Sequence, residues 1–204
     1  LESDFSKMPQ VVAEGRRVVN NIQQSASLFL VKNIFSFLLS LVSIIFVFTY
    51  PLGPSQISLI SLFTIGIPGF FLSLQPNKNV IRGHFLQNVL LKALPAGLTD
   101  VLVVAALAIF SQTFGVSGKD LSTASTMLLA IVGFMILFKI CKPLNPLRGV
   151  ICAVCIIGFL ASCFLFPGLF GISSMSTKCV MLFVVFSIAT EPILRYLTKF
   201  NELI

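Results

Sequence analysis

The longest stretch without an ionisable side chain limits what this chain can fold into more than any other feature. From Asn33 to Asn77 there is no Asp, Glu, Lys, Arg or His. One bilayer crossing needs about 20 apolar residues, so this run predicts two membrane-spanning helices joined by a turn. Of all 204 residues, 56% are hydrophobic and only 10% are charged, which is too little charge for the surface of a soluble domain. We therefore expect an all-α, polytopic membrane protein.

Apolar windows along the whole chain predict six spans in one bundle with short connections. We expect a cytoplasmic segment at 1–25, a six-helix transmembrane domain at 26–198 and a cytoplasmic tail at 199–204. The predicted spans are Ala26–Phe48, Gln56–Leu74, Leu94–Phe114, Leu121–Ile140, Leu147–Phe166 and Cys179–Leu197.

The basic residues predict the orientation of these spans. Cytoplasmic loops of membrane proteins carry an excess of Lys and Arg. With six spans, the side that holds both termini carries Lys7, Arg16, Arg17, Lys78, Arg82, Lys92, Lys139, Lys142, Arg148, Arg195 and Lys199. The opposite side carries Lys119 and Lys178. This bias predicts that both termini are cytoplasmic. It also explains the net charge of +7 without a nucleic-acid partner, because the charges are too scattered for a binding face.

The first predicted span contains polar residues, which are costly inside a membrane. Asn33, Ser36, Ser40 and Ser43 recur at helical spacing and so share one face. They either line a hydrated or ion-binding cavity or make hydrogen bonds between helices. Lys32 has two interpretations as well: a positive charge that competes with or replaces a transported cation, or an anchor whose stem reaches the membrane surface.

The second predicted span contains the sequence TIGIPGFF at Thr64–Phe71. Pro68 removes a backbone donor and frees a carbonyl about one turn earlier, and the glycines on either side ease unwinding. A discontinuous helix here would expose carbonyls and the hydroxyls of Thr64 and Ser61 to a cation. A simple proline kink is the alternative.

Two acidic residues, Asp100 and Glu191, lie inside predicted spans, both near the expected cytoplasmic ends. Glu191 has Arg195 four residues later, which predicts an ordinary i,i+4 ion pair.

Several motifs together resemble the P-type cation-transporting ATPases. EGRRVVNNIQ at Glu14–Gln23, followed by a helix that carries Asn33, resembles the junction between the phosphorylation domain and the fifth transmembrane helix of that family. TIGIPGFFLSLQPN at Thr64–Asn77 is similar to the sixth helix, in a form nearest to bacterial calcium-pump-like members. The resemblance covers essentially the whole chain. It implies that 1–25 is a stalk at the end of the phosphorylation domain and that the six spans are helices five to ten.

The resemblance also implies roles for individual residues. Asn33 and Thr64 fall at positions of cation ligands in calcium pumps. Ser36 stands where those pumps have a glutamate, Ser61 where they have an asparagine and Ile65 where they have an aspartate. Two carboxylates of a two-calcium site are therefore absent, which puts the calcium assignment and its stoichiometry in doubt.

On this basis we expect part of the ion pathway of an ATP-driven cation pump, with calcium as the candidate ion. The expected pathway residues are Asn33, Thr64, Ser36, Ser61 and Pro68, with Lys32 as an internal counter-charge and Asn33 and Thr64 as cation ligands. The family's DKTG and TGDG motifs are absent from this sequence, so ATP and Mg²⁺ would bind elsewhere in a parent polypeptide of a bacterial cell membrane. The expected partners are the lipid bilayer and the remainder of that polypeptide. The alternatives are a self-standing six-helix secondary transporter or channel and an accessory membrane subunit.

Overall fold

A computed structural model describes residues 7–75, 84–142 and 145–201 of the chain. In these ranges the structure is helical and contains six helical segments long and apolar enough to cross a membrane. The all-α, polytopic architecture predicted from the sequence is therefore confirmed. The elements are α1 (Met8–Ile45), α2 (Pro54–Ser61), the π-helical turn η2 (Leu62–Gly66), α3 (Ile67–Ser73), α4 (Phe85–Thr113), α5 (Gly118–Ile140), α6 (Pro146–Leu165), α7 (Pro167–Phe170) and α8 (Thr177–Asn201).

The first helix is longer than the predicted span. α1 runs without a break from Met8 through the polar segment into the apolar one, with a proline in its first turn where the missing N–H costs nothing. It ends at Ile45, before the predicted end at Phe48, and Val47 has a φ of 52° that no helix continues through. The boundary between a stalk and a membrane domain near residue 25 stays a prediction, because the helix itself does not mark it.

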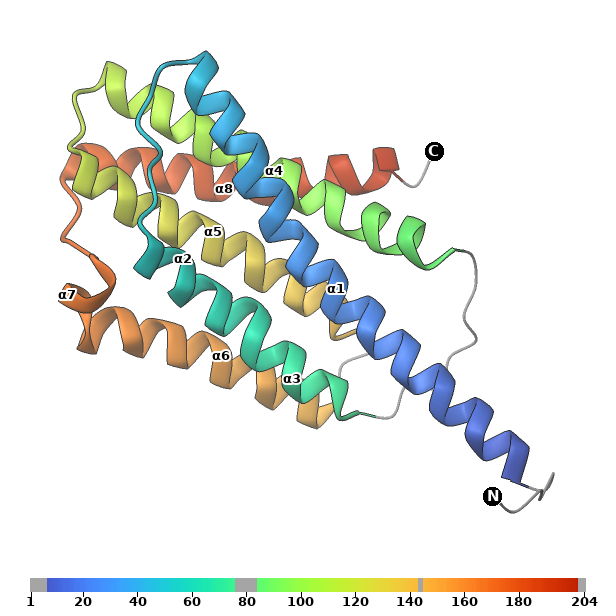
Figure 1. Cartoon of the computed structure of the whole chain (residues 1–204). Helices are drawn as coiled ribbons and strands as arrows, with labels where there is room; N and C mark the ends of the chain where they lie inside the picture. Colours follow the sequence, from blue (N-terminus) through green and yellow to red (C-terminus); the bar gives the residue numbers. More distant parts are fainter. Residues whose placement is uncertain (1–6, 76–83, 143–144, 202–204) are drawn as a thin grey trace.

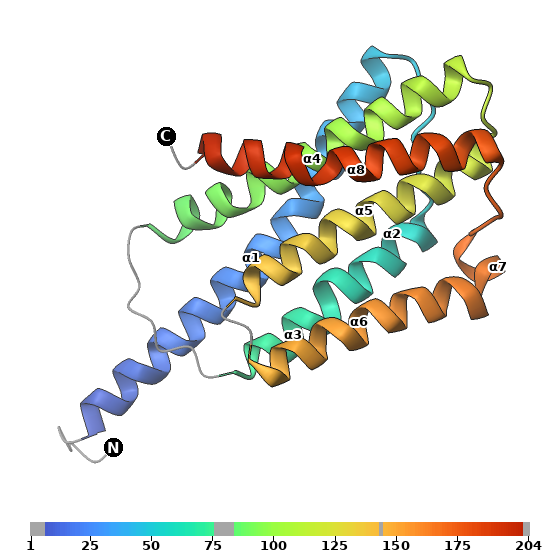
Figure 2. The same ribbon diagram turned by 180° about the vertical axis from the view of Figure 1, so that it is seen from behind.

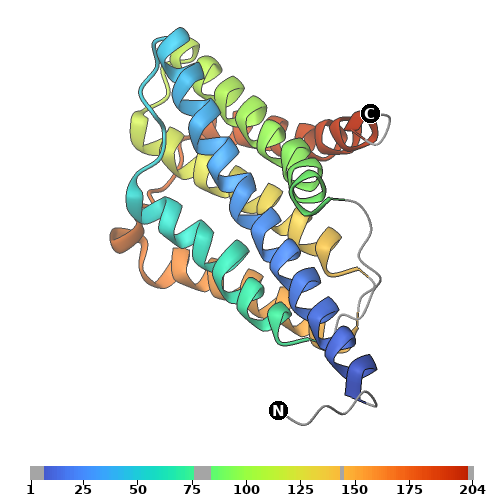
Figure 3. The same cartoon turned by 45° about the vertical axis from the view of Figure 1, so that its right-hand side comes forward.

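Helix α4 packs against three other spans. It packs along α1 on one side and against α8 and α5 on the others, while α2, η2 and α3 lie between α5, α6 and α1 (Figures 1 and 2). Successive spans alternate in direction, so α1 begins and α8 ends on the side where α3 ends and α4 begins (Figure 1, with a turned view in Figure 3). An even number of crossings with both ends on one side agrees with the six-span prediction.

The second span resolves the two readings of TIGIPGFF. The helix is continuous, but the turn before Pro68 is widened into a π-helix, in which the N–H of Ile67 donates to the carbonyl of Leu62. A π-helical turn is a recognised way to place a proline in a helix without a clash with the preceding carbonyl, and such turns are frequent at functional sites. This span is therefore neither unwound nor simply kinked.

Several helix–helix contacts depend on glycine, among them those of Gly133 and Gly97. A Cβ added at Gly133 of α5 would lie 2.7 Å from Cγ2 of Thr64, and one at Gly97 of α4 would lie 2.7 Å from Cγ2 of Ile34 in α1. Both distances are shorter than real carbon contacts allow. Small residues let membrane helices approach closely, so these glycines set the separation of α5 from η2 and of α4 from α1.

At the end of the bundle away from the two termini, the buried side chain of Gln56 joins three segments. Oε1 of Gln56 accepts from the backbone N–H of Gly53 at 2.9 Å and from Oγ of Ser122 at 2.6 Å. Nε2 of the same residue donates to the carbonyl of Gly171 at 3.1 Å. Gln56 therefore ties the start of α2 to α5 and to the turn after α7.

Candidate cation-binding cavity

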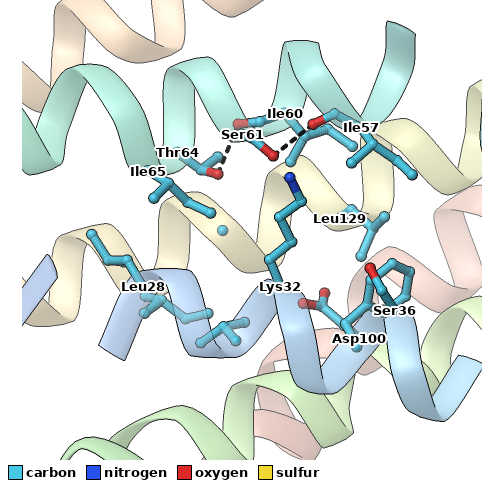
Figure 4. Close-up of a pocket in the computed structure, with 14 residues that line it drawn as sticks. Leu28, Lys32, Ser36, Ile57, Ile60, Ser61, Thr64, Ile65, Asp100 and Leu129 are labelled. Carbon is cyan, nitrogen blue, oxygen red and sulfur yellow. Dashed lines mark hydrogen bonds between the residues drawn. The ribbon is translucent and has the colours of Figure 1, made fainter. Parts of the chain in front are cut away.

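A cavity of about 50 Å³ lies between α1, the α2–η2 segment, α4 and α5. That volume accommodates a few water molecules or a partly hydrated ion. The cavity separates two apolar clusters, one around Phe35 and Leu129 and one around Leu28 and Ile136. Its polar lining consists of Lys32, Ser36, Ser61, Thr64 and Asp100 (Figure 4).

Two hydroxyl groups of the second span face this cavity. Oγ of Ser61 donates to the carbonyl of Ile57 at 2.7 Å, and Oγ1 of Thr64 donates to the carbonyl of Ile60 at 2.8 Å. A hydroxyl has one proton and two lone pairs, so a donated proton leaves the lone pairs available. Both oxygens can therefore act as neutral ligands for a cation without breaking a hydrogen bond of the helix.

Two ionisable side chains, Lys32 and Asp100, line the cavity among the described residues. Asp100 is 5% exposed, and its Oδ1 is buried with no hydrogen-bond partner. Lys32 extends from α1 across the cavity towards Ser61, while the carboxyl of Asp100 enters from α4 beside the stem of Lys32 (Figure 4). The ion pairs found between described residues join Glu14 to Arg17 and Glu191 to Arg195, and neither includes Lys32 or Asp100.

The structure brings together four of the predicted pathway residues: Lys32, Ser36, Ser61 and Thr64 all line the cavity. The remaining two lie elsewhere. Asn33 is on the exposed face of α1, and Pro68 is buried in α3 outside the cavity lining. The role of each of these six residues in ion transport stays a prediction.

Asp100 was not among the predicted pathway residues, because it was expected near a membrane surface. Helix α4 begins at Phe85, well before the predicted start at Leu94. Asp100 lies about 22 Å along the helix from its first residue, at 1.5 Å per residue, and its place near the cytoplasmic end of the span stays a prediction. The signal that could have identified it is the acidic side chain in an apolar span without a basic residue one turn away.

The ligand types of this cavity favour hard cations. The available groups are a carboxylate and hydroxyl oxygens, which suit Mg²⁺, Ca²⁺ or alkali ions better than soft metals. No cluster of three or more His, Cys, Asp or Glu side chains suited to a resident metal occurs in the part of the chain that the structure describes. Asp100 is the carboxylate among the residues of this lining.

Fold and cavity together define a polytopic helical protein, with spans long and apolar enough to cross a membrane and a mainly apolar, partly open cavity between them that contains Lys32 and Asp100. Comparison with known proteins then gives the family. The chain is 36% identical over 185 residues to "Probable cation-transporting ATPase exp7" of Streptococcus pneumoniae, with 87% of this chain and 24% of that protein aligned. By sequence the chain is therefore homologous to a part of the P-type cation-transporting ATPases, which confirms the resemblance seen in its motifs.

Mycobacterial proteins named as calcium-transporting ATPases are also similar to this chain. "Calcium-transporting ATPase CtpE" of Mycolicibacterium smegmatis is 32% identical over 178 residues, covering 78% of this chain and 22% of that protein. The protein of the same name from Mycobacterium tuberculosis is 33% identical over 157 residues, covering 70% and 20%. The chain thus spans about a quarter or less of the length of these curated relatives. No protein-family profile and no solved structure matches it.

Proposed function

We propose that this chain forms part of the ion pathway of an ATP-driven cation pump, and that the transported ion is Ca²⁺. The observation that carries the proposal is the cavity between the spans, whose lining combines Asp100, Thr64 and Ser61. The names of the relatives support it, since they are cation-transporting and calcium-transporting ATPases. ATP and Mg²⁺ would bind in other parts of the parent polypeptide, which would couple hydrolysis to the cavity through the long helix α1.

The proposal is tested by removing one neutral ligand from the cavity. In the complete pump, we expect Thr64→Val to raise the Ca²⁺ concentration that half-activates ATP hydrolysis roughly fivefold to tenfold, about 1 kcal/mol of lost binding. Valine keeps the shape of threonine and removes only the hydroxyl. The measurement is Ca²⁺-dependent ATPase activity of the purified protein over a range of free Ca²⁺.

Thr99→Val is the matched control for this variant. Thr99 is fully buried in α4 and its Oγ1 donates to the carbonyl of Pro95 at 2.7 Å, the same bond that Thr64 makes to Ile60. It does not line the cavity. Equal activation curves for wild type and Thr64→Val would contradict a ligand role and favour an accessory subunit. Cation flux through this chain alone, without ATP, would favour a self-standing transporter or channel.

We also propose that both termini are cytoplasmic, in a bacterial cell membrane. Lys119 and Lys199 are exposed at opposite ends of the bundle. A membrane-impermeant maleimide should label Lys119→Cys in intact cells and Lys199→Cys only after the cells are permeabilised. The unsubstituted protein controls for the native thiols. The reverse labelling pattern would overturn the orientation.

A further inference from the structure

Asp100 is the most unusual side chain in this membrane domain. It is an acidic residue that is 5% exposed, it has an unpartnered Oδ1, and it lines a cavity large enough for water or an ion. A buried polar atom without a partner is costly, and a carboxylate inside a membrane segment is more so. A cost of this kind is expected where the group has a ligand during the working cycle.

Lys32 supplies the opposite charge in the same cavity. With both side chains ionised, Asp100 and Lys32 give the lining a formal charge of zero among the described residues. A cation that entered beside the charged Lys32 would leave a positive excess in a medium of low dielectric constant, which is unfavourable. Binding of a cation is therefore easier if the ammonium group leaves the cavity.

We propose that Asp100 is the charged ligand of a cation site in this cavity, and that Lys32 is a tethered cation that balances Asp100 when the site is empty and moves away when a cation binds. The inference rests on the proposed function and assigns its one charged ligand to α4. Thr64 of η2 and Ser61 at the end of α2 line the same cavity and would supply neutral oxygens.

The side chain of Lys32 has the flexibility for such a movement. Its stem has four carbons and rotates freely, and the residue is half-buried. The ammonium group can thus leave its place beside Ser61 by rotation of the side chain, without displacing α1 (Figure 4). Asp100, buried in α4, remains in place.

The experiment measures Ca²⁺ binding to the complete pump without ATP and Ca²⁺ activation of its ATPase. We expect Asp100→Asn to weaken binding roughly tenfold to a hundredfold, as loss of a buried charged contact does. Lys32→Met should tighten binding, because the competing charge is removed. The double variant should not equal the sum of the two single changes, since the side chains act on the same charge balance.

Glu191→Gln is the control, because Glu191 is the exposed acidic residue of α8 and pairs with Arg195. It should bind Ca²⁺ like wild type. Lys32→Met could fold poorly because it leaves the charge of Asp100 unbalanced. In that case the double variant, which removes both charges, is compared with Asp100→Asn for its binding of Ca²⁺. Folded Asp100→Asn protein that binds Ca²⁺ within twofold of wild type would overturn this inference alone. A wild-type pump that neither binds nor responds to Ca²⁺ would overturn the proposed function and the inference with it.

Discussion

Gly133→Leu should destabilise the bundle by about 3 kcal/mol or more and abolish Ca²⁺-dependent ATP hydrolysis by the complete pump. Even a Cβ at this position would lie 2.7 Å from Cγ2 and 3.0 Å from Cβ of Thr64. The threonine is on a widened helical turn packed between α1, α5 and α6, so it cannot retreat without moving the backbone. Overpacking of this kind costs about 1–3 kcal/mol and more where the neighbour is fixed. The measurements are the apparent Tm in detergent and the ATPase activity.

The matched control is Gly149→Leu in α6. Gly149 is also within a helix, but a Cβ there would meet no atom within 4 Å. Leucine is a better helix former than glycine, so this variant should be as stable as wild type or slightly more so. If Gly133→Leu and Gly149→Leu melted at the same temperature, the close approach of α5 to Thr64 would not be important for stability.

Gln56→Ala is the second change with a large expected effect. It removes three hydrogen bonds, to Gly53, Ser122 and Gly171, from a side chain that is 3% exposed. Each such bond contributes about 1 kcal/mol net, and a buried group left without a partner costs more, so we expect a loss of roughly 2–4 kcal/mol. The loss should appear as a lower Tm and as faster proteolysis of the turn that contains Gly171.

Gln112→Ala is the control for this second variant. Gln112 is at the same end of the bundle, near the end of α4, and is exposed. Its replacement should change the free energy of unfolding by no more than about 0.5 kcal/mol, so the Tm should stay close to that of the wild type. A Gln56→Ala protein as stable as Gln112→Ala would show that the three segments are held together by apolar packing without help from this residue.

The sequence predicted the spans well because crossing a membrane depends on local composition. The run from Asn33 to Asn77 could only form two crossings, and the structure has α1 and the α2–η2–α3 segment there. Helix ends were predicted less well. The polar part of α1 and the first turns of α4 are helical although they lie outside apolar windows, because helices extend past the membrane wherever nothing stops them.

The cavity was only partly predictable. Thr64 and Ser61 were identified because Pro68 indicated an irregular turn, and the structure has such a turn beside them. Its form, a π-helix within a continuous span, did not follow from the sequence. Asp100 could be recognised as costly but not assigned to this cavity, since nothing in the sequence says which face of α4 meets α1 and α5.

Lys32 and Asn33 show most directly which properties follow from the sequence alone and which depend on the tertiary structure. The sequence by itself determined that both residues lie in a membrane-spanning helix, because hydrophobicity along the chain decides that. Successive residues of an α-helix point about 100° apart, so these neighbours cannot face the same way. Only the packing of α1 against α4, set by contacts such as that of Gly97 with Ile34, turned Lys32 into the cavity beside Asp100 and left Asn33 exposed. Rotation of a helix about its axis is decided by the shapes of its neighbours, which lie far away in the sequence.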